Sequence, residues 1–530
     1  MRRCSRYLFE APWVLLRLAL IISAVVFSST LWLRTTNQWA LKNLGDTFLR
    51  KHIGRRPIVL SSHYRPPHED SGNYLVIIFL GDTRMPHELY CFSNDSAGNG
   101  MSQRALVQRI HEGKRAANDI CSWSGFLAEC KVAARDLPVI GISTVESIHQ
   151  SIDIHPEPSY RPSNGERHKL VVCIAPMYIY TDWQIMLLGM ETWLALGATK
   201  IIVPIQSCTE TAYRILQHYA KDDLVIIRSW PKWPLLSDVN PNGLILSRGI
   251  EESHVSCLHF VKPWAELVVF SDFDDMLIPY DPSTVHPLAN VEIIEKIARD
   301  HPQAGSFLFE HRDVQLILPK NDPGQSPSLD RFSFDFLSNT HWKTLCRLVR
   351  QKTRVIVNAS RVDSVNMHET GIHRFGYVQV RVPCREAHFY HMRHSYSNIG
   401  VNEKSIDLTR LSDMINRNYK ARLATTLKGM AQEEVNVSST ESFADFDKCM
   451  GSINGEHWTM QVSRCLTPHV CHNSHPRRGN DPCVATTGLY RFKRTGEDYV
   501  VVLQNTSFIP SLPNCEAPHP ELTGDYFYMP

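Results

Sequence analysis

The chain has 530 residues, which is too long for one compact core and suits two or three domains. Its 56 Lys and Arg against 54 Asp and Glu give a formal net charge of +2, so charge offers no reason to expect nucleic-acid binding. Hydrophobic residues make up 43% and charged residues 21%, values that exclude a mostly disordered chain. The composition is that of a folded globular protein.

An apolar segment near the N-terminus, residues 13–33, is interrupted only by Arg17. A helix of this length matches a hydrocarbon core of roughly 30 Å. Three arginines precede the segment, which predicts a cytosolic tail over 1–12 and translocation of everything after residue 34. A cleaved signal peptide is the alternative, but the run is long for a signal core and lacks a clear Ala-X-Ala site. Both interpretations place the bulk of the chain in the secretory lumen or outside the cell.

The cysteines and the glycosylation motifs point to the same compartment. Of the 14 cysteines only Cys4 lies in the predicted cytosolic tail, and the others form no Cys-X-X-Cys pair, which favours disulfides over zinc binding. The thirteen that remain are an odd number, so at least one thiol is free or bonded to another chain. Four Asn-X-Ser/Thr motifs are present, at Asn94, Asn358, Asn436 and Asn505.

The chain divides into four segments after the predicted anchor. Residues 34–72 hold prolines and charges with little apolar periodicity, and we expect a stem there. A small β-containing module is predicted over 73–165, with strands at 73–80 and 89–93. The domain that follows covers 166–410. The tail, 411–530, carries five cysteines and is predicted to be a disulfide-tied appendage.

Within the 166–410 domain, apolar strand patterns alternate with amphipathic helix patterns. Strands are predicted at 169–175, 200–205, 224–228 and 266–271, and helices at 183–196, 210–219 and 248–262. Asp182 is positioned to cap the first helix and Gly197 to end it. This alternation predicts an α/β fold with a mainly parallel, doubly wound sheet, whose ligands bind at the carboxyl ends of the strands.

Three carboxylates, Asp272, Asp274 and Asp275, directly follow the fourth predicted strand in the sequence VVFSDFDDMLIP. Their mutual repulsion is unfavourable unless a cation or protons offset it. Hard oxygen ligands suit Mg²⁺ or Mn²⁺, which would be shared with substrate phosphates. Two aspartates at this spacing are common on solvated loops, but their position after a buried strand favours a metal and cofactor site.

Three functions are compatible with this cluster. In a nucleotide-sugar transferase the aspartates hold a metal that neutralises the leaving diphosphate. In a haloacid-dehalogenase-like phosphatase Asp272 would be the nucleophile. That class needs Thr or Val where Met276 stands and places its motif after the first strand of the core, so it is disfavoured. A non-catalytic, glycan-binding ectodomain on the same fold is the third hypothesis, but such a protein has no reason to retain three carboxylates at a strand end.

The segments VVCIAPMYIYTDW, GMETWLALGATK, VVFSDFDDMLIP, TRVIVNASRVDSVNMHETG and AHFYHMRHSY, in this order, resemble glycosyltransferase family 92 over roughly 168–400. The resemblance implies a GT-A-type fold, and a single-pass type II Golgi membrane protein with a lumenal catalytic domain. It also implies Mn²⁺- (or Mg²⁺-) dependent, inverting transfer of a hexose. For the donor and acceptor it implies UDP-galactose and a fucose or galactose of a glycan.

The resemblance also suggests roles for individual residues. Asp272 and Asp274 match the metal-binding pair of the family, and Asp275 stands where the family usually has Glu. Ahead of Cys257 the family's Asn-Asp is replaced by Val255-Ser256. This departure affects the expected nucleotide contacts.

The remaining metal ligand and the base are less defined by the sequence. A histidine from the late part of the domain often completes the metal shell in GT-A enzymes, and His391 is our first choice and His368 the second. Inverting transfer needs a carboxylate that accepts the proton of the acceptor hydroxyl. Glu310 and Asp313, in FLFEHRDV, are the candidates, although either could be a solvated residue or a partner of Arg312.

Overall fold

The computed structural model describes residues 20–26, 28–29, 54–66, 72–110, 121–158, 160, 165–236, 240–316, 328–343, 353–366, 368–393, 403–433, 435, 449, 452–453, 465–468, 470–471, 482–512 and 515–524. The predicted tail 1–12 and most of the predicted anchor 13–33 lie outside these ranges; residues 20–26 and 28–29 of the anchor are helical. No helix in the described ranges combines the length and hydropathy needed to cross a bilayer. The chain divides into two units, 1–54 with 496–498, and the remainder, which contains all the features below.

Four parallel strands form the first half of the large sheet, in the order β12-β10-β9-β13. They are β9 (His168–Ile174), β10 (Lys200–Ile205), β12 (Val225–Ser229) and β13 (Ala265–Ser271). The helices between them are α2 (Trp183–Ala195), α3 (Glu210–Lys221) and α4 (Ile250–Val261). The strands and helices predicted in this region are confirmed to within a few residues.

Local chemistry accounts for both ends of α2. The Asp182 side chain accepts a hydrogen bond of 3.1 Å from the backbone N–H of Ile185, as an N-cap should. After the helix, Gly197 has a φ of +113°, a conformation that side chains other than glycine rarely adopt. A Cβ atom at Gly197 would also lie 3.0 Å from the Cα of Leu288, so both backbone and packing require glycine here.

Beyond β13 the sheet stops being parallel, which corrects the prediction of a mainly parallel sheet. The added strands are β15 (Ala304–Gln315), β16 (Thr340–Lys343), β17 (Thr353–Asn358), β20 (Val378–Arg381) and β22 (Glu403–Ile406), with the pair β14 (Asp275–Pro279) and β21 (Ala387–Arg393) beside them. Strand β17 runs antiparallel to both β13 and β15, whereas β21 is parallel to β15. Among the residues described between β14 and β22, α5 (Ala289–Asp300) is the one α-helix, so regular βαβ crossovers no longer dictate parallel pairing.

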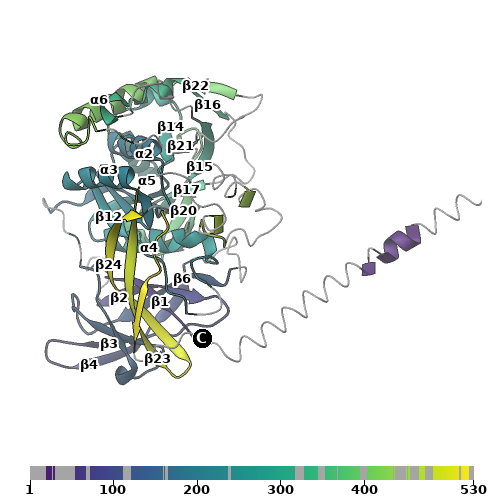
Figure 1. The fold of residues 1–530 in the computed structure, drawn as a ribbon, viewed down its shortest axis with the longest axis vertical. Coiled ribbons are helices and arrows are strands. Elements are labelled where there is room, and N and C mark those ends of the chain that lie inside the picture. Colours follow the sequence, from purple (N-terminus) through teal and green to yellow (C-terminus); the bar gives the residue numbers. More distant parts are fainter. Residues whose placement is uncertain are drawn as a thin grey trace, which may run out of the picture. The chain divides into compact units, whose positions relative to one another are not determined.

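The upstream module and the C-terminal tail share one sheet, of order β11-β23-β24-β1-β2-β6-β5 with β25 beside β23. Its strands are β1 (Ile58–Tyr64), β2 (Tyr74–Asp82), β5 (Leu106–Arg109), β6 (Trp123–Lys131), β11 (Ser207–Thr209), β23 (Cys483–Thr495), β24 (Asp498–Leu512) and β25 (Glu521–Gly524). In Figure 1 the yellow strands β23 and β24 lie beside β1 and β2. Strand β1 thus falls within the residues 34–72 expected as a stem, and β23 and β24 fall within the residues 411–530 expected as an appendage.

Smaller elements complete the unit. A four-stranded sheet has the order β4-β3-β7-β8, and a two-stranded sheet pairs β18 with β19. Their strands are β3 (Tyr90–Asn94), β4 (Gly100–Arg104), β7 (Ile140–Ser143), β8 (Ile152–Ile154), β18 (Val362–Val365) and β19 (Thr370–His373). Helix α6 (Thr409–Ala424) packs on α2, where its Arg422 Nε lies 2.8 Å from Oε1 of the buried Glu191. Residues 409–424 thus extend across the expected domain boundary at 410.

Helix α4 is enclosed between the two large sheets, because it contacts β1 and β2 on one side and β9 and β13 on the other. Polar contacts cross this layer: the Ser61 and Ser256 hydroxyls are 2.9 Å apart. The Lys262 ammonium, just after α4, donates to Asp363 Oδ1 at 2.6 Å, and Arg65 donates to Asp363 Oδ2 at 3.2 Å. The module is therefore packed into the core of the unit.

Disulfides link distant parts of the chain, as the cysteine pattern predicted. The described pairs are Cys91–Cys130, Cys121–Cys465, Cys173–Cys257, Cys449–Cys471 and Cys483–Cys515. Cys384 is also disulfide-bonded. Among the cysteines in the described ranges, Cys208 is free and buried, in keeping with the odd count.

Candidate active site

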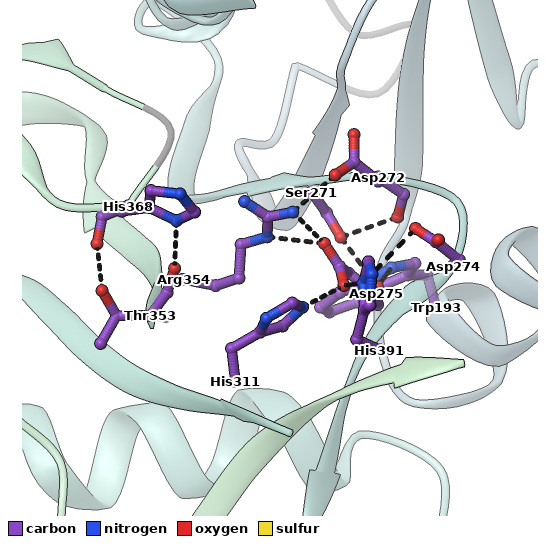
Figure 2. Close-up of polar contacts among 10 residues, drawn as sticks. All are labelled: Trp193, Ser271, Asp272, Asp274, Asp275, His311, Thr353, Arg354, His368 and His391. Carbon is purple, nitrogen blue, oxygen red and sulfur yellow. Dashed lines mark hydrogen bonds and ion pairs between the residues drawn. The ribbon is translucent and has the colours of Figure 1, made fainter. Parts of the chain in front are cut away.

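Asp272 and Asp274 lie in the turn that joins β13 to β14, and Asp275 is the first residue of β14. Side chains from three neighbouring strands converge on this cluster (Figure 2). The converging residues are His311 of β15, Arg354 of β17 and His391 of β21. Strand pairing sets this arrangement, because Asp275 lies opposite His391 in the β14–β21 ladder. Segments more than a hundred residues apart in the sequence thus meet at the end of the fourth parallel strand.

Asp275 is the centre of the cluster and is fully buried. Its Oδ1 lies 2.5 Å from His311 Nε2 and 2.6 Å from His391 Nδ1, and its Oδ2 accepts from Arg354 Nε at 2.6 Å. Burial by itself would raise the pKa of Asp275, but Arg354 and the two imidazoles outweigh it and hold the pKa well below its usual range. Asp275 is therefore ionised and can only accept hydrogen bonds.

Asp272 also accepts a hydrogen bond from Arg354, but its pKa is shifted in the opposite direction from that of Asp275. Arg354 Nη2 donates to Asp272 Oδ2 at 2.5 Å, and the Asp272 side chain is 34% exposed, whereas that of Arg354 is 5% exposed. Desolvation, together with the charges of Asp275 and Asp274, raises the pKa of Asp272 to about 6 although Arg354 opposes the rise. The cluster thus holds more negative charge than one guanidinium compensates.

The donor set fits a divalent cation. The carboxylates of Asp272, Asp274 and Asp275 offer oxygens that all lie within 4.8 Å of one another, as do the ligand atoms of Asp275, His311 and His391. Three carboxylates and one guanidinium leave a net charge of −2 when the imidazoles are neutral, which one divalent ion would balance. Burial lowers the pKa of His311 to about 4, consistent with a neutral imidazole. Oxygen and imidazole ligands suit Mn²⁺ and Mg²⁺.

The two predicted histidines differ in their positions. His391, the first choice, lies in the cluster, with Nδ1 3.8 Å from Asp274 Oδ1. His368 contacts the backbone of β17 instead: its Nδ1 is 3.0 Å from the carbonyl oxygen of Thr353, whose hydroxyl donates to the His368 carbonyl at 2.6 Å. Figure 2 shows His368 turned toward Thr353, so the structure does not bring it to the carboxylates.

Glu310 also lies apart from the carboxylates. Its oxygens lie 3.8 Å from Arg312 Nη2 and 3.6 Å from Arg381 Nη2, and only 8% of the residue is exposed. Successive side chains of a strand point to opposite faces, and His311 faces the cluster, so Glu310 faces away from it. The structure does not support Glu310 as the base. Asp313 pairs with His391 through the β15–β21 ladder, but its side chain lies outside the described part of the chain.

Sequence reasoning missed three residues of this site. His311 stands inside the FLFEHRDV segment, and Arg354 is the second residue of the strand pattern TRVIVN, but only the strand register shows that both face Asp275. The third is Tyr180, whose buried hydroxyl has no hydrogen-bond partner among the described residues. Its ring lies 5.6 Å from that of Phe273, between Asp272 and Asp274, and burial together with the charges of nearby aspartates raises the pKa of Tyr180.

Solved structures of Staphylococcus aureus TarS were found by comparison of folds. TarS 1–349 in complex with UDP-GlcNAc aligns with 56% of this chain and 81% of its own length, at 11% identity and a TM-score of 0.22. The longer TarS structure aligns with 62% of this chain and 60% of its own, at 10% identity and a TM-score of 0.24. At such low TM-scores the likeness carries no structural or functional inference.

Sequence relatives are more informative. Glycosyltransferase family 92 protein C33H5.2 of Caenorhabditis elegans is 22% identical over 213 residues, 39% of each chain, so the match spans about two fifths of that relative. Glycosyltransferase family 92 protein F59C6.8 of the same organism is 22% identical over 339 residues, 63% of this chain and 61% of the relative. The family model for glycosyltransferase family 92 matches residues 168–427, which include the parallel strands, the acidic cluster and His391. This match confirms the predicted resemblance to glycosyltransferase family 92 over residues 168–427.

Proposed function

We propose that the protein is a metal-dependent, inverting glycosyltransferase that moves a hexose from a nucleotide sugar onto a glycan. The observation that carries the proposal is the acidic cluster at the carboxyl end of β13 inside a family 92 segment. The cluster has a net charge of −2, which one divalent cation would balance. A doubly wound sheet places its ligands at this edge of the strands.

In this proposal Asp272, Asp274 and His391 hold one Mn²⁺ or Mg²⁺. When bound, the ion neutralises the charge that develops on the departing diphosphate. Asp272 and Asp274 are the more accessible carboxylates, with side chains 34% and 16% exposed, so they can be reached by a substrate. Arg354 adds a fixed positive charge beside them, which favours binding of an anionic nucleotide diphosphate.

The remaining parts of the reaction follow from the family resemblance. We propose UDP-galactose as the donor and a fucose or galactose residue of a glycan as the acceptor. For the base that takes the proton of the acceptor hydroxyl, Asp313 is the candidate, because its backbone lies beside His391 whereas Glu310 faces away.

We also propose that residues 13–33 anchor the protein in the Golgi membrane, with the catalytic domain in the lumen. The described disulfides support an oxidising compartment of this kind. The anchor itself rests on the apolar pattern and its flanking charges.

The test is release of UDP from UDP-galactose by the purified full chain, with a panel of fucosylated and galactosylated glycans as acceptors. Paired samples contain Mn²⁺ or EDTA. The variant Asp274→Asn removes one proposed ligand charge at nearly constant volume. Its matched control is Asp300→Asn, because Asp300 is an exposed residue at the end of α5.

We expect acceptor-dependent UDP release in Mn²⁺ that is lost in EDTA and in Asp274→Asn but kept in Asp300→Asn. Absence of release and of binding with UDP-galactose and with other nucleotide sugars, from a protein that is folded, would refute the transferase. A non-catalytic glycan-binding protein would then be the better hypothesis. A phospho-aspartyl intermediate trapped on Asp272 would instead indicate the phosphatase.

A further inference from the structure

We infer that Asp275 is a positioning residue that orients His391 toward the bound metal ion, and that His311 and Arg354 hold Asp275 in place for this task. The inference rests on the proposed function, because it concerns the same metal site. It gives Asp275, which the sequence places in one acidic cluster with the two proposed ligands, a supporting role of its own.

The direction of the hydrogen bonds gives the first argument. Asp275 Oδ2 accepts from the Arg354 guanidinium at 2.6 Å, so this contact is an ion pair, and the ring nitrogens at 2.5 and 2.6 Å from Oδ1 donate to the paired carboxylate. His391 therefore carries its proton on Nδ1, which leaves the lone pair that coordination requires on Nε2. A carboxylate that fixes the tautomer and ring orientation of a metal-binding histidine is a recurrent arrangement around metal sites.

The surroundings of Asp275 give the second argument, because both of its oxygens are engaged by protein donors. Oδ1 accepts from the two imidazoles, and Oδ2 accepts from Arg354, whose guanidinium would repel a cation at the same oxygen. Asp275 is fully buried, whereas Asp272 and Asp274 are partly exposed. A cation shared with a substrate is therefore more readily held by Asp272 and Asp274.

The third argument is that the backbone of Asp275 is also fixed. Its carbonyl oxygen accepts from Trp193 Nε1 at 3.2 Å and from Ser271 Oγ at 2.8 Å (Figure 2). The His311 ring makes an edge-to-face contact with the His391 ring, with centroids 4.5 Å apart. His311 thus limits the rotation of both the Asp275 carboxylate and the His391 imidazole.

Mn²⁺ affinity of the full chain, measured from the electron paramagnetic resonance signal of free Mn²⁺ with and without UDP, tests the inference without any turnover. We expect Asp275→Asn and His391→Ala each to weaken Mn²⁺ binding about 10- to 100-fold. If Asp275 acts through His391, the double variant binds no more than about threefold more weakly than His391→Ala alone. Additive losses in the double variant would mean that Asp275 is itself a ligand and would overturn the inference.

A second series examines the role of His311. Gln keeps an N–H donor near the position of His311 Nε2, so His311→Gln should bind Mn²⁺ within about threefold of the wild type, whereas His311→Leu should lose about tenfold. His388→Phe is the matched control, because His388 is fully buried on the same strand as His391 but lies outside the cluster. Equal losses in His311→Gln and His311→Leu would contradict a donor role, and a loss in His388→Phe would show that burial alone explains the effects.

The two proposals fail in different ways. A wild-type chain that binds Mn²⁺ through His391 but transfers no sugar refutes the proposed function and leaves the positioning role of Asp275 intact. A wild-type chain that transfers sugar while the double variant shows additive losses refutes the positioning role alone. A folded wild-type chain that binds no Mn²⁺, even with UDP, refutes the metal site and with it the inference.

Discussion

Lowering the pH from 7.5 to 5.5 is expected to destabilise the folded protein, and four buried, neutral histidines contribute about 5 kcal/mol to this loss. Burial is the largest cause in each of four cases: it lowers the pKa of His63 and His87 to about 4, and that of His254 and His388 to about 3. In the unfolded chain a histidine has a pKa of about 6.5. Between the folded and unfolded values the unfolded state binds more protons, so stability falls as the pH falls.

The magnitude follows from the free energy of protonating the unfolded histidine, which grows as RT ln(1 + 10^(pKa − pH)). Between pH 7.5 and 5.5 this term increases by about 1.3 kcal/mol for each site, and the folded-state term is negligible over that range. Four independent sites therefore contribute about 5 kcal/mol, comparable with the whole stability of an ordinary domain. The neutral His259 and His311 add to this loss, whereas Glu191 and Glu252, whose pKa values burial raises, take up protons in the folded state and offset part of it. The loss begins as the pH falls through about 6.5 and continues until the folded-state values near 4 and 3.

Urea unfolding of the purified chain, with its disulfides intact, measures the effect at steps of half a pH unit. His388→Phe removes one titrating site and should reduce the pH-dependent loss by about a quarter, whatever it does to stability at pH 7.5. His149→Asn is the control, because His149 is exposed in the folded state as it is in the unfolded state. A stability that stays constant or rises between pH 7.5 and 5.5 would refute the reasoning, as would an unchanged slope in His388→Phe.

Three further predictions concern the core of the unit. Lys262→Met removes the fully buried ammonium that donates to Asp363 at 2.6 Å and leaves the partly buried Asp363 with Arg65 alone, which should cost about 3 kcal/mol in urea unfolding. Adding Asp363→Leu should recover part of this loss, and no loss in the single variant would contradict the reasoning. The Cys208 thiol is buried, which raises its pKa, so iodoacetamide should label the Cys208 peptide in denaturant only, and labelling of the native protein would refute its burial. A chain truncated after residue 480 lacks β23 and β24 and should give no soluble folded protein. A chain truncated after residue 520 lacks only the edge strand β25 among the described strands and should fold. Equal yields of folded protein from the two truncated chains would show that the tail is an appendage.

The sequence by itself determined the features that depend on neighbouring residues. The strands β9, β10, β12 and β13 were predictable because each is a short apolar run, and α2 because Asp182 and Gly197 signal its ends. The acidic cluster could be found in the same way, since three carboxylates within four residues after a buried strand are a local pattern. The disulfide-rich character followed from cysteine number and spacing alone.

Only the tertiary structure decided which distant segments meet. That β23 and β24 complete the sheet of β1 and β2 depends on the pairing of residues more than four hundred positions apart, for which no local pattern exists. The same holds for the site: His311 and Arg354 face Asp275, and Glu310 does not, because of the strand register. A shift of one residue in register would exchange the two faces of a strand, so the identity of the residues around the carboxylates is fixed by long-range pairing and not by the local sequence.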